Sequence, residues 1–378
     1  MWASSNVTVL LLCERSNFRN QQHFVLHLKV LALMKIIFIA AAVIISFSCP
    51  VYGVDEAEQI ASIIRDAHKS GRFSGAALVA RGRQVIFKGS AGIADVDKQR
   101  QNTVATPFRL ASMTKGFTAT LVLQAIGRGD LKLDSSLADL LPESDNAALR
   151  PVTVHHLLSH TSGIPDFRPA AHGTQTVRDA LIAKLHAVKL DFAPGEKFAY
   201  CNGCFTTLGI VLEKISGKPF SEFAREHLFQ PAGMGSTMVE VGGRAAGGRA
   251  TGYKLVSGEL IRNEEADLSS VEAAGAIVST VEDLFRFSRA LSTGRLLSLD
   301  MQKGMLNPVG EINGYGVFIR PSPAGRAMQI FAGGMPGSST VMARVNGGEI
   351  VVILLSNLSD MPLQKLAEQI LRSLQAQP

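Results

Sequence analysis

A long apolar run begins at the stretch Phe108-Arg109-Leu110-Ala111-Ser112-Met113-Thr114-Lys115-Gly116, in which a serine stands three residues before a lysine. If the run is a helix, Ser112 and Lys115 lie one turn apart on the same face. Ser112 then lies in the first turn, where the helix dipole and free N–H groups favour developing negative charge. A hydroxyl, an amine that can share its proton and a positive local field together make an activated nucleophile. A structural serine beside a surface lysine explains this spacing at least as well, so the remaining sequence has to decide.

The composition is that of a globular protein. The 378 residues are 46% hydrophobic and 19% charged, which provides ample material for a core and argues against disorder. The formal net charge is +6, of which residues 1–53 contribute half through four basic residues and one acidic residue. The sequence has no block of Lys and Arg interleaved with aromatic residues, so we expect no nucleic-acid partner.

The N-terminal segment has the features of an export signal. Met34-Lys35 is followed by an apolar run from Ile36 to Phe47 and by small residues up to Gly53, a pattern typical of secretory signal peptides. We therefore expect an upstream extension at residues 1–33, a signal peptide at 34–53 and a secreted or periplasmic mature protein. The run is shorter than the ~20 residues that span a membrane, so no stable span is expected in the mature form. Anchoring in the membrane through the N-terminal segment is the alternative.

Hydrophobic patterning places strands at both ends of residues 54–378 and helices between them. The predicted strands are 75–80, 84–93, 315–319, 329–331, 338–344 and 349–355. The predicted helices are 56–67, the buried run that starts near Ser112, 208–215, the segment opened by the capping pattern Ser279-x-x-Glu282, and one after Pro362. This order predicts an α+β fold, an antiparallel sheet flanked by N- and C-terminal helices with an inserted, mostly helical domain. The sheet part comprises about 54–110 and 300–378, and the helical part about 111–299.

A second polar motif, Tyr200-Cys201-Asn202, follows Ser112 by 88 residues. An ammonium group beside a tyrosine favours the phenolate, which makes Tyr200 a candidate general base. Asn202 supplies a side-chain amide that can hold Lys115 or a substrate. An aromatic core residue without a catalytic role is the alternative for Tyr200.

Cys201 and Cys204 are the two cysteines that follow the leader, and they form a single Cys-x-x-Cys. The spacing is compatible with a thioredoxin-like redox site, a local disulfide or two packed thiols. The surrounding sequence does not resemble a thioredoxin unit, which favours the second and third interpretations.

Three histidines, His155, His156 and His160, lie close together in the sequence, and the i,i+4 spacing of the last two is compatible with a metal site. No glutamate general base lies between them, so structural roles are favoured and no metal is expected. Asp166, shortly afterwards, is expected to be a cap or loop residue.

Five segments resemble, in the same order, motifs of the serine β-lactamase and penicillin-binding superfamily, specifically its class C β-lactamase, D-Ala-D-Ala carboxypeptidase and esterase branch. They are 108–115, Leu157-Leu158-Ser159-His160-Thr161-Ser162-Gly163, 194–202, 273–283 and Gly333-Gly334-Met335-Pro336-Gly337. The resemblance covers about residues 75 to 358, and the combination is specific although each segment alone is not.

The resemblance implies a β-lactamase/transpeptidase-like fold, with the site in a cleft between a sheet domain and a helical domain. It implies that Ser112 is the acylated nucleophile, that Lys115 and Tyr200 manage its proton, and that Asn202 is their polar support. The oxyanion hole would be formed by the backbone N–H groups of Ser112 and Gly334. This chemistry requires neither a metal nor a cofactor.

The third motif departs from the usual form of the family, which has a lysine or histidine, a small or hydroxyl residue and then a glycine. This chain has Phe331-Ala332-Gly333 at that place. Shifting the register by one residue puts Ala332 at the cationic position, so neither alignment supplies a cation. With Gly334, these residues make up the predicted oxyanion and substrate-binding strand. It lacks the groups that would hold the carboxylate carried by penicillins and D-Ala-D-Ala peptides.

The sequence therefore predicts an exported serine hydrolase that forms a covalent acyl-serine intermediate on an ester, amide or β-lactam bond. Esters or amides without an essential carboxylate are favoured, and the substrate would be a small molecule or a cell-wall peptide. The alternative is a catalytically weak, penicillin-binding-like protein that binds cell-wall peptide or a partner. An oxidoreductase that uses Cys201 and Cys204 is a remote third hypothesis.

Overall fold

The computed structural model describes residues 54–167, 176–241, 246–306 and 313–374. The predicted upstream extension and signal peptide, residues 1–53, lie outside the described residues. Within the described ranges, no helix combines the length and hydropathy that a membrane crossing requires.

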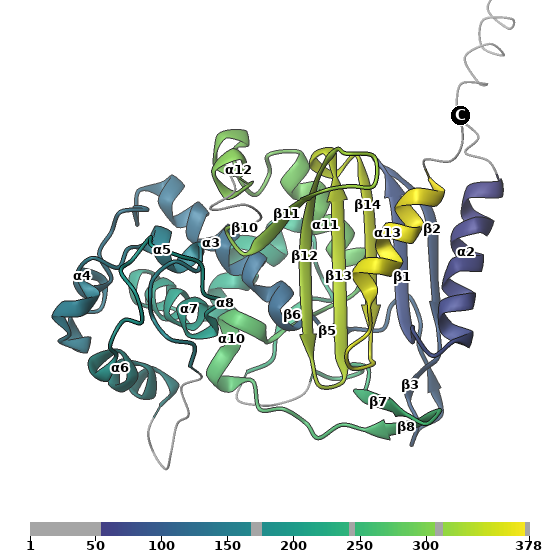
Figure 1. Ribbon diagram of the computed structural model, residues 1–378, viewed down its shortest axis with the longest axis horizontal. Coiled ribbons are helices and arrows are strands. Elements are labelled where there is room, and N and C mark those ends of the chain that lie inside the picture. Colours follow the sequence, from purple (N-terminus) through teal and green to yellow (C-terminus); the bar gives the residue numbers. More distant parts are fainter. Residues whose placement is uncertain (1–53, 168–175, 242–245, 307–312, 375–378) are drawn as a thin grey trace, which may run out of the picture. The chain divides into compact units, whose positions relative to one another are not determined.

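A seven-stranded antiparallel sheet is the framework of the fold (Figure 1). Its strand order is β10-β11-β12-β13-β14-β1-β2. The strands are β1 (Gly75–Arg81), β2 (Gln84–Ala91), β10 (Asn313–Gly314), β11 (Val317–Pro321), β12 (Ala327–Met335), β13 (Ser338–Val345) and β14 (Ile350–Ser356). Because β1 pairs with β14, the sheet is built from both ends of the described chain, as the sequence predicts.

Helices cover both faces of the sheet. α2 (Val54–Lys69) and α13 (Leu363–Ser373) lie on one face (Figure 1), where they share a core with Val352 of β14. α11 (Val281–Ser292) packs against β14 and β1, and Ile353 of β14 belongs to this second core. Since both faces of β14 are covered, its sequence is apolar throughout rather than alternating between apolar and polar residues.

Most of the helices lie in sequence between β2 and β10. They are α3 (Thr114–Arg128), α4 (Leu137–Leu140), α5 (Val154–Leu158), α6 (Val177–Ala187), α7 (Asn202–Ser216), α8 (Phe220–Ala224), α9 (Gln230–Ala232), α10 (Glu272–Gly275), α11 and α12 (Leu299–Leu306). Short strands form three small sheets, β3 (Ile93–Asp95) with β4 (Arg100–Gln101), β5 (Phe108–Arg109) with β9 (Ile277–Ser279) and β6 (Met238–Val239), and β7 (Tyr253–Val256) with β8 (Glu259–Arg262). The predicted α+β fold with an inserted helical part is confirmed, although α11 packs on the sheet.

Two element boundaries differ from the predictions for local reasons. The second predicted strand ends at Ala91, because Gly92 has a φ of 76° and redirects the chain. The helix α11 begins after Thr280 rather than after Ser279. The Thr280 hydroxyl accepts a hydrogen bond from the Asp283 backbone N–H at 3.2 Å, which satisfies one of the free donors of the first turn.

Candidate active site

The serine and lysine of the first motif lie one turn apart, as predicted. Ser112 belongs to a short 3₁₀ turn, Ala111–Met113, that leads directly into α3, which carries Lys115. The Lys115 Nζ lies 3.2 Å from the Ser112 Oγ. It also donates hydrogen bonds to the side-chain oxygen of Asn202 and to the carbonyl of Ala274, both at 2.9 Å. The lysine is only 2% exposed, so its interpretation as a surface residue is wrong.

Tyr200 reaches the same serine from the second motif. Its hydroxyl oxygen and the Ser112 Oγ are 2.8 Å apart and hydrogen-bonded. The Lys115 Nζ lies 4.9 Å from the centre of the tyrosine ring. Because Tyr200 is 37% exposed as a residue, it borders the cleft and is not a buried core residue. A hydroxyl with two proton-handling groups within hydrogen-bond reach has the geometry of an activated nucleophile.

Asp166 orients Asn202. Its two carboxylate oxygens accept hydrogen bonds from the Asn202 backbone N–H at 2.6 Å and from the side-chain NH₂ at 3.0 Å. With the NH₂ group held there, the amide presents its oxygen to Lys115. The sequence predicted only a cap or loop residue at Asp166, because 36 residues separate the two partners and no local pattern links them.

His160 holds the segment that carries Tyr200. Its backbone carbonyl accepts the Ala199 N–H at 2.8 Å, and its Nδ1 accepts the Cys201 N–H at 3.1 Å. Its ring stacks on the Tyr200 ring with 4.7 Å between centroids. Burial, together with the positive charge of Lys115, lowers the pKa of His160 to about 3. The imidazole is therefore neutral at pH 7, and its contacts are those of a positioning residue.

The low pKa of His160 predicts a loss of stability in acid. Between pH 6.5 and pH 3 the unfolded chain binds a proton at this residue and the folded chain does not, so stability falls as the pH falls through that window. The free energy of unfolding falls by up to roughly 1.4 kcal/mol for each pH unit in this window. His160→Asn keeps a hydrogen-bond acceptor and tolerates the φ of 59°. We expect the urea midpoint of the variant to fall less than that of the parent between pH 6.5 and pH 4.5. An equal fall in both proteins would contradict the low pKa of His160.

A disulfide joins Cys201 to Cys204, which selects the local disulfide among the three interpretations of the Cys-x-x-Cys. Both residues are buried. Cys201 is the N-cap of α7, and its sulfur accepts the Cys204 backbone N–H at 3.0 Å. The bond thus closes the first turn of α7, the turn on which Asn202 lies.

The third motif lies on β12, and its side chains alternate between two environments. Phe331 is fully buried and packs edge to face against Phe287 at 6.0 Å. A Cβ added at Gly116 of α3 would lie 2.4 Å from the Phe331 ring, so the ring is pressed against the backbone of that helix. Ala332, in contrast, lines the cleft with Ser112. The structure thus places the alanine at the cleft and the phenylalanine in the core, away from any bound substrate.

Gly333 brings β12 into contact with the turn that carries the nucleophile. A Cβ at this position would lie 2.1 Å from the Leu110 carbonyl oxygen and 2.9 Å from the Ser112 nitrogen. A Cβ at Gly334 would meet no atom within 4 Å. Ala111, just before the serine, has a φ of 49°, a strained conformation of the kind that clusters at functional sites.

An open cavity of about 510 Å³ begins at Ser112, a volume within the range of small-molecule sites. Its lining includes Ser112, Tyr200, Phe318, Ala332, Gly333, Gly334, Met361, Leu363 and Lys365. The cavity therefore contains the predicted nucleophile, the candidate base and three of the four residues predicted to form the substrate-binding strand.

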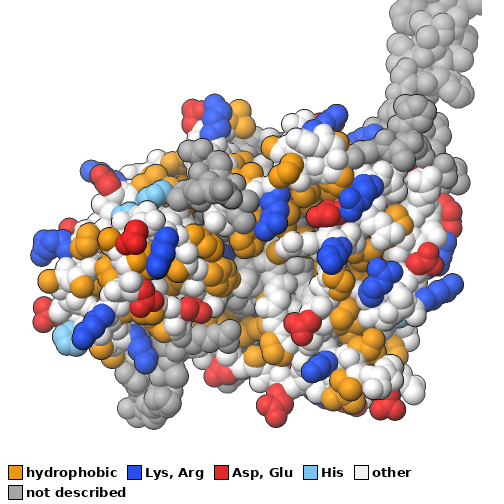
Figure 2. All heavy atoms as spheres, viewed as in Figure 1, with side chains coloured by type: hydrophobic (Ala, Val, Ile, Leu, Met, Phe, Trp, Pro, Cys, Tyr) orange, Lys and Arg blue, Asp and Glu red, His pale blue; other side chains and the backbone are white. Residues whose placement is uncertain are grey.

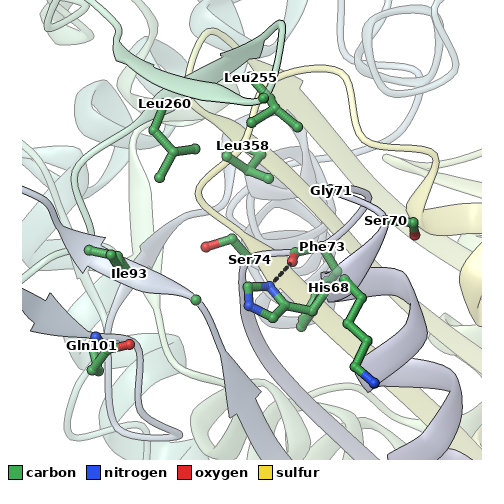
Figure 3. Close-up of a pocket in the computed structure, with 13 residues that line it drawn as sticks. His68, Ser70, Gly71, Phe73, Ser74, Ile93, Gln101, Leu255, Leu260 and Leu358 are labelled. Carbon is green, nitrogen blue, oxygen red and sulfur yellow. Dashed lines mark hydrogen bonds between the residues drawn. The ribbon is translucent and has the colours of Figure 1, made fainter.

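A second cavity, of about 700 Å³, lies at the end of α2 under the β7–β8 hairpin (Figure 3). Apolar side chains that border it are Leu255, Leu260 and Leu358 (Figure 3). Its serine hydroxyls donate to protein oxygens, Ser70 at 2.7 Å and Ser74 at 2.9 Å. The His68 Nδ1 lies 2.9 Å from the Phe73 carbonyl oxygen and so donates to it. Among the described residues, neither hydroxyl is hydrogen-bonded to a lysine or tyrosine side chain, which distinguishes this cavity from the one at Ser112.

Charged side chains of both signs are interspersed over the face shown in Figure 2. Binding to a nucleic-acid backbone depends on a concentrated positive surface. The charge on this face is mixed in sign. The absence of a nucleic-acid partner stays a prediction.

The family of the chain follows from a comparison with known families. Residues 60–375 match the family model described as Beta-lactamase. The chain belongs to the beta-lactamase family. The resemblance drawn from the five motifs is thereby confirmed.

Several known proteins are similar to this chain over half of their length or more. The putative penicillin-binding protein PbpX of Bacillus subtilis is 28% identical over 307 residues, 81% of this chain and 75% of the relative. The esterase EstB of Burkholderia gladioli is 32% identical over 204 residues, 47% of this chain and 50% of the esterase. The crystal structure of a penicillin-binding protein from Bacillus halodurans superposes with a TM-score of 0.71 and 28% identity, over 84% of this chain and 98% of that one.

These relatives place this member of the beta-lactamase family in a superfamily of serine hydrolases that includes penicillin-binding proteins and esterases. The solved structure confirms the predicted fold class. The catalytic roles of Ser112, Lys115, Tyr200 and Asn202 remain predictions, as do the oxyanion donors.

Proposed function

We propose that this protein is an exported serine hydrolase that acts through a covalent acyl-Ser112 intermediate on ester or amide bonds. One observation carries the proposal. The Ser112 Oγ lies 2.8 Å from the Tyr200 hydroxyl and 3.2 Å from the Lys115 Nζ. A buried lysine, a tyrosine and a serine have no structural need to bring their polar ends together at the mouth of a cleft, whereas nucleophilic catalysis requires such a cluster.

The reaction proceeds in two halves. Ser112 Oγ attacks the carbonyl carbon while its proton passes to the phenolate oxygen of Tyr200, the form of the tyrosine that the Lys115 ammonium favours. The backbone N–H groups of Ser112 and Gly334 stabilise the oxyanion. The bond to the leaving group then breaks, and Tyr200 returns the proton to the departing oxygen or nitrogen. Water repeats the sequence on the acyl-serine, which releases the acid and regenerates the hydroxyl.

The cleft favours substrates without an essential carboxylate. On β12, the position that usually carries a cation holds the buried Phe331, and the next position holds the methyl group of Ala332. Lys365 contributes a cation to the cleft from α13 rather than from the strand beside the oxyanion donors. A substrate carboxylate therefore finds no charge-assisted hydrogen bond from the β12 side chains.

Substrate comparison tests this proposal. The purified protein is assayed with p-nitrophenyl acetate, a neutral ester, and with nitrocefin, a β-lactam that carries a carboxylate, and Ser112→Ala is the blank. A charge-assisted hydrogen bond contributes about 1.5–3 kcal/mol, so we expect kcat/KM for the neutral ester to be at least about tenfold higher. Equal or faster turnover of nitrocefin would overturn the substrate assignment. Full ester hydrolysis by Ser112→Ala would overturn the mechanism.

A catalytically weak, penicillin-binding-like protein is the second candidate, and Phe331 and Ala332 favour it. Such a protein would bind cell-wall peptide or a partner and turn over little. Rapid, Ser112-dependent hydrolysis of simple esters would rule it out.

Export is part of the proposal. Residues 34–53 would be removed as a signal peptide, so that the hydrolase domain comprises residues 54–378 and is secreted or periplasmic. Cell fractionation with N-terminal sequencing of the recovered protein tests this. A mature N-terminus near Val54 supports cleavage, whereas an intact N-terminal segment in the membrane fraction would establish the anchored alternative.

A further inference from the structure

Two cavities meet at the nucleophile. Besides the open cavity of about 510 Å³, a small one of about 30 Å³ lies beside Ser112. Both are lined by Ser112, Tyr200, Phe318 and Ala332. The small cavity adds Lys115, His160, Asn313, Gly314, Gly316, Val317 and Ile330. It thus includes three of the four predicted catalytic residues, Ser112, Lys115 and Tyr200, but none of the residues of α13 that line the open cavity.

Asn313 is the residue of the small cavity that the catalytic motifs leave unexplained. It is the first residue of β10, the strand at one edge of the sheet, and it pairs with Phe318 of β11. Its side chain is 7% exposed. Within the described ranges, its Oδ1 is buried without a hydrogen-bond partner. A buried acceptor left unpaired costs about 1–3 kcal/mol, so such an atom beside a reacting group calls for an explanation.

The size and the chemistry of this cavity fit a single water molecule. A water needs roughly 10–15 Å³ of room and two to four polar partners, and the cavity offers about 30 Å³. The hydroxyls of Ser112 and Tyr200 and the Asn313 Oδ1 are the candidate partners, while Val317 and Ile330 supply apolar walls. An acyl or leaving group of ordinary size does not fit there and has to occupy the open cavity.

We propose that the small cavity holds the water that hydrolyses the acyl-enzyme and that the Asn313 Oδ1 orients this water by accepting a hydrogen bond from it. The inference rests on the proposed acyl-Ser112 mechanism. The water oxygen forms a bond to the acyl carbon while its second proton passes to the phenolate oxygen of Tyr200. The tetrahedral intermediate then collapses, the bond between the acyl carbon and Ser112 Oγ breaks, and Tyr200 returns the proton to Oγ. The products are the free acid and the Ser112 hydroxyl.

The acyl-enzyme lifetime tests the role of Asn313. The purified protein and Asn313→Leu are each mixed with p-nitrophenyl acetate. Samples are quenched at intervals, and the acetylated fraction is measured by intact-mass spectrometry. Leucine has a similar size but cannot accept a hydrogen bond. We expect the acetylated form of the variant to persist about tenfold longer, the effect of one lost hydrogen bond. The rate of nitrophenol release in the first turnover should stay within about twofold of the parent, because acylation uses the serine and not the water.

Two further variants separate orientation of water from general damage. Asn313→Asp keeps an acceptor oxygen, so its acyl-enzyme lifetime should be close to that of the parent. Asn313→Ala replaces the leucine variant if the latter does not fold. The rate of labelling by a fluorophosphonate, which needs Ser112 but no water, should be unchanged in every folded variant. A parent-like lifetime in Asn313→Leu, or equal slowing of acylation and deacylation, would overturn this inference alone. Failure of the parent protein to form any acyl-enzyme would overturn the proposed function and this inference together.

Discussion

Replacing Lys115 with methionine is expected to lower kcat/KM for p-nitrophenyl acetate by roughly a thousandfold, within the range for a group that transfers a proton in the transition state. The ammonium lies 3.2 Å from the Ser112 Oγ and 4.9 Å from the centre of the Tyr200 ring. Methionine has a similar length but neither the charge nor a proton to share. Removing the charge weakens Tyr200 as a base and leaves the acceptors on Asn202 and Ala274 without this donor.

A matched variant checks that the effect is local. Lys303→Met removes an exposed lysine, whose side chain is 79% accessible, and should retain the activity of the parent. Circular dichroism melting establishes that both variants are folded at the assay temperature. Activity of Lys115→Met within tenfold of the parent would show that the lysine is not part of the proton path.

Replacing Gly333 with alanine is expected to lower kcat/KM by roughly a hundredfold to a thousandfold, the range reported for the loss of an oxyanion donor. The new Cβ would lie 2.1 Å from the Leu110 carbonyl oxygen and 2.9 Å from the Ser112 nitrogen. These neighbours are backbone atoms, so β12 has to move away from the serine turn. The predicted donors on Ser112 and Gly334 then no longer point at one oxygen. Overpacking of this kind also costs about 1–3 kcal/mol of stability, so activity is measured well below the melting temperature.

Gly334→Ala is the structural control for this prediction. A Cβ there meets no atom within 4 Å, so the melting temperature should match that of the parent, whereas that of Gly333→Ala should fall. Parent-like kcat/KM in Gly333→Ala would contradict the close packing of β12 on the nucleophile turn.

The groups around Ser112 could be predicted from the sequence because they lie in short motifs with chemical meaning. Lys115 follows from helical spacing, and Tyr200 with Asn202 from a compact motif of the family. His160, Asp166 and Asn313 could not be found in this way. His160 and Asp166 act through contacts between distant segments, such as the 41 residues between His160 and the Cys201 N–H, and side chains of all three types occur in many loops.

The third motif shows the limit of reading a strand from sequence. The sequence Phe331-Ala332 shows that this strand lacks the usual cation, but it does not show which of the two side chains faces the cleft. Side chains on a strand alternate, so one residue faces the cleft and the next faces the core. Only the pairing of β12 with its neighbours determines which residue faces the cleft. The space beside Gly116 allows the ring of Phe331 to pack there.

The framework of the fold was easier to predict than its details. β13 and β14 follow from apolar runs on either side of Asn346-Gly347-Gly348, where Gly347 has a φ of 69°, a backbone conformation that favours glycine. The packing of α11 on the sheet could not be predicted, since amphipathicity shows that a helix has an apolar face but not which surface it covers.

The most direct test of the central claim is the intact mass of purified residues 54–378 after treatment with a fluorophosphonate, measured beside Ser112→Ala. The account predicts one adduct on the parent protein, located by peptide mapping to the segment that contains Ser112, and none on the folded variant. A folded parent protein that takes up no adduct, or a variant that takes up as much as the parent, would contradict the claim that Ser112 is an activated nucleophile.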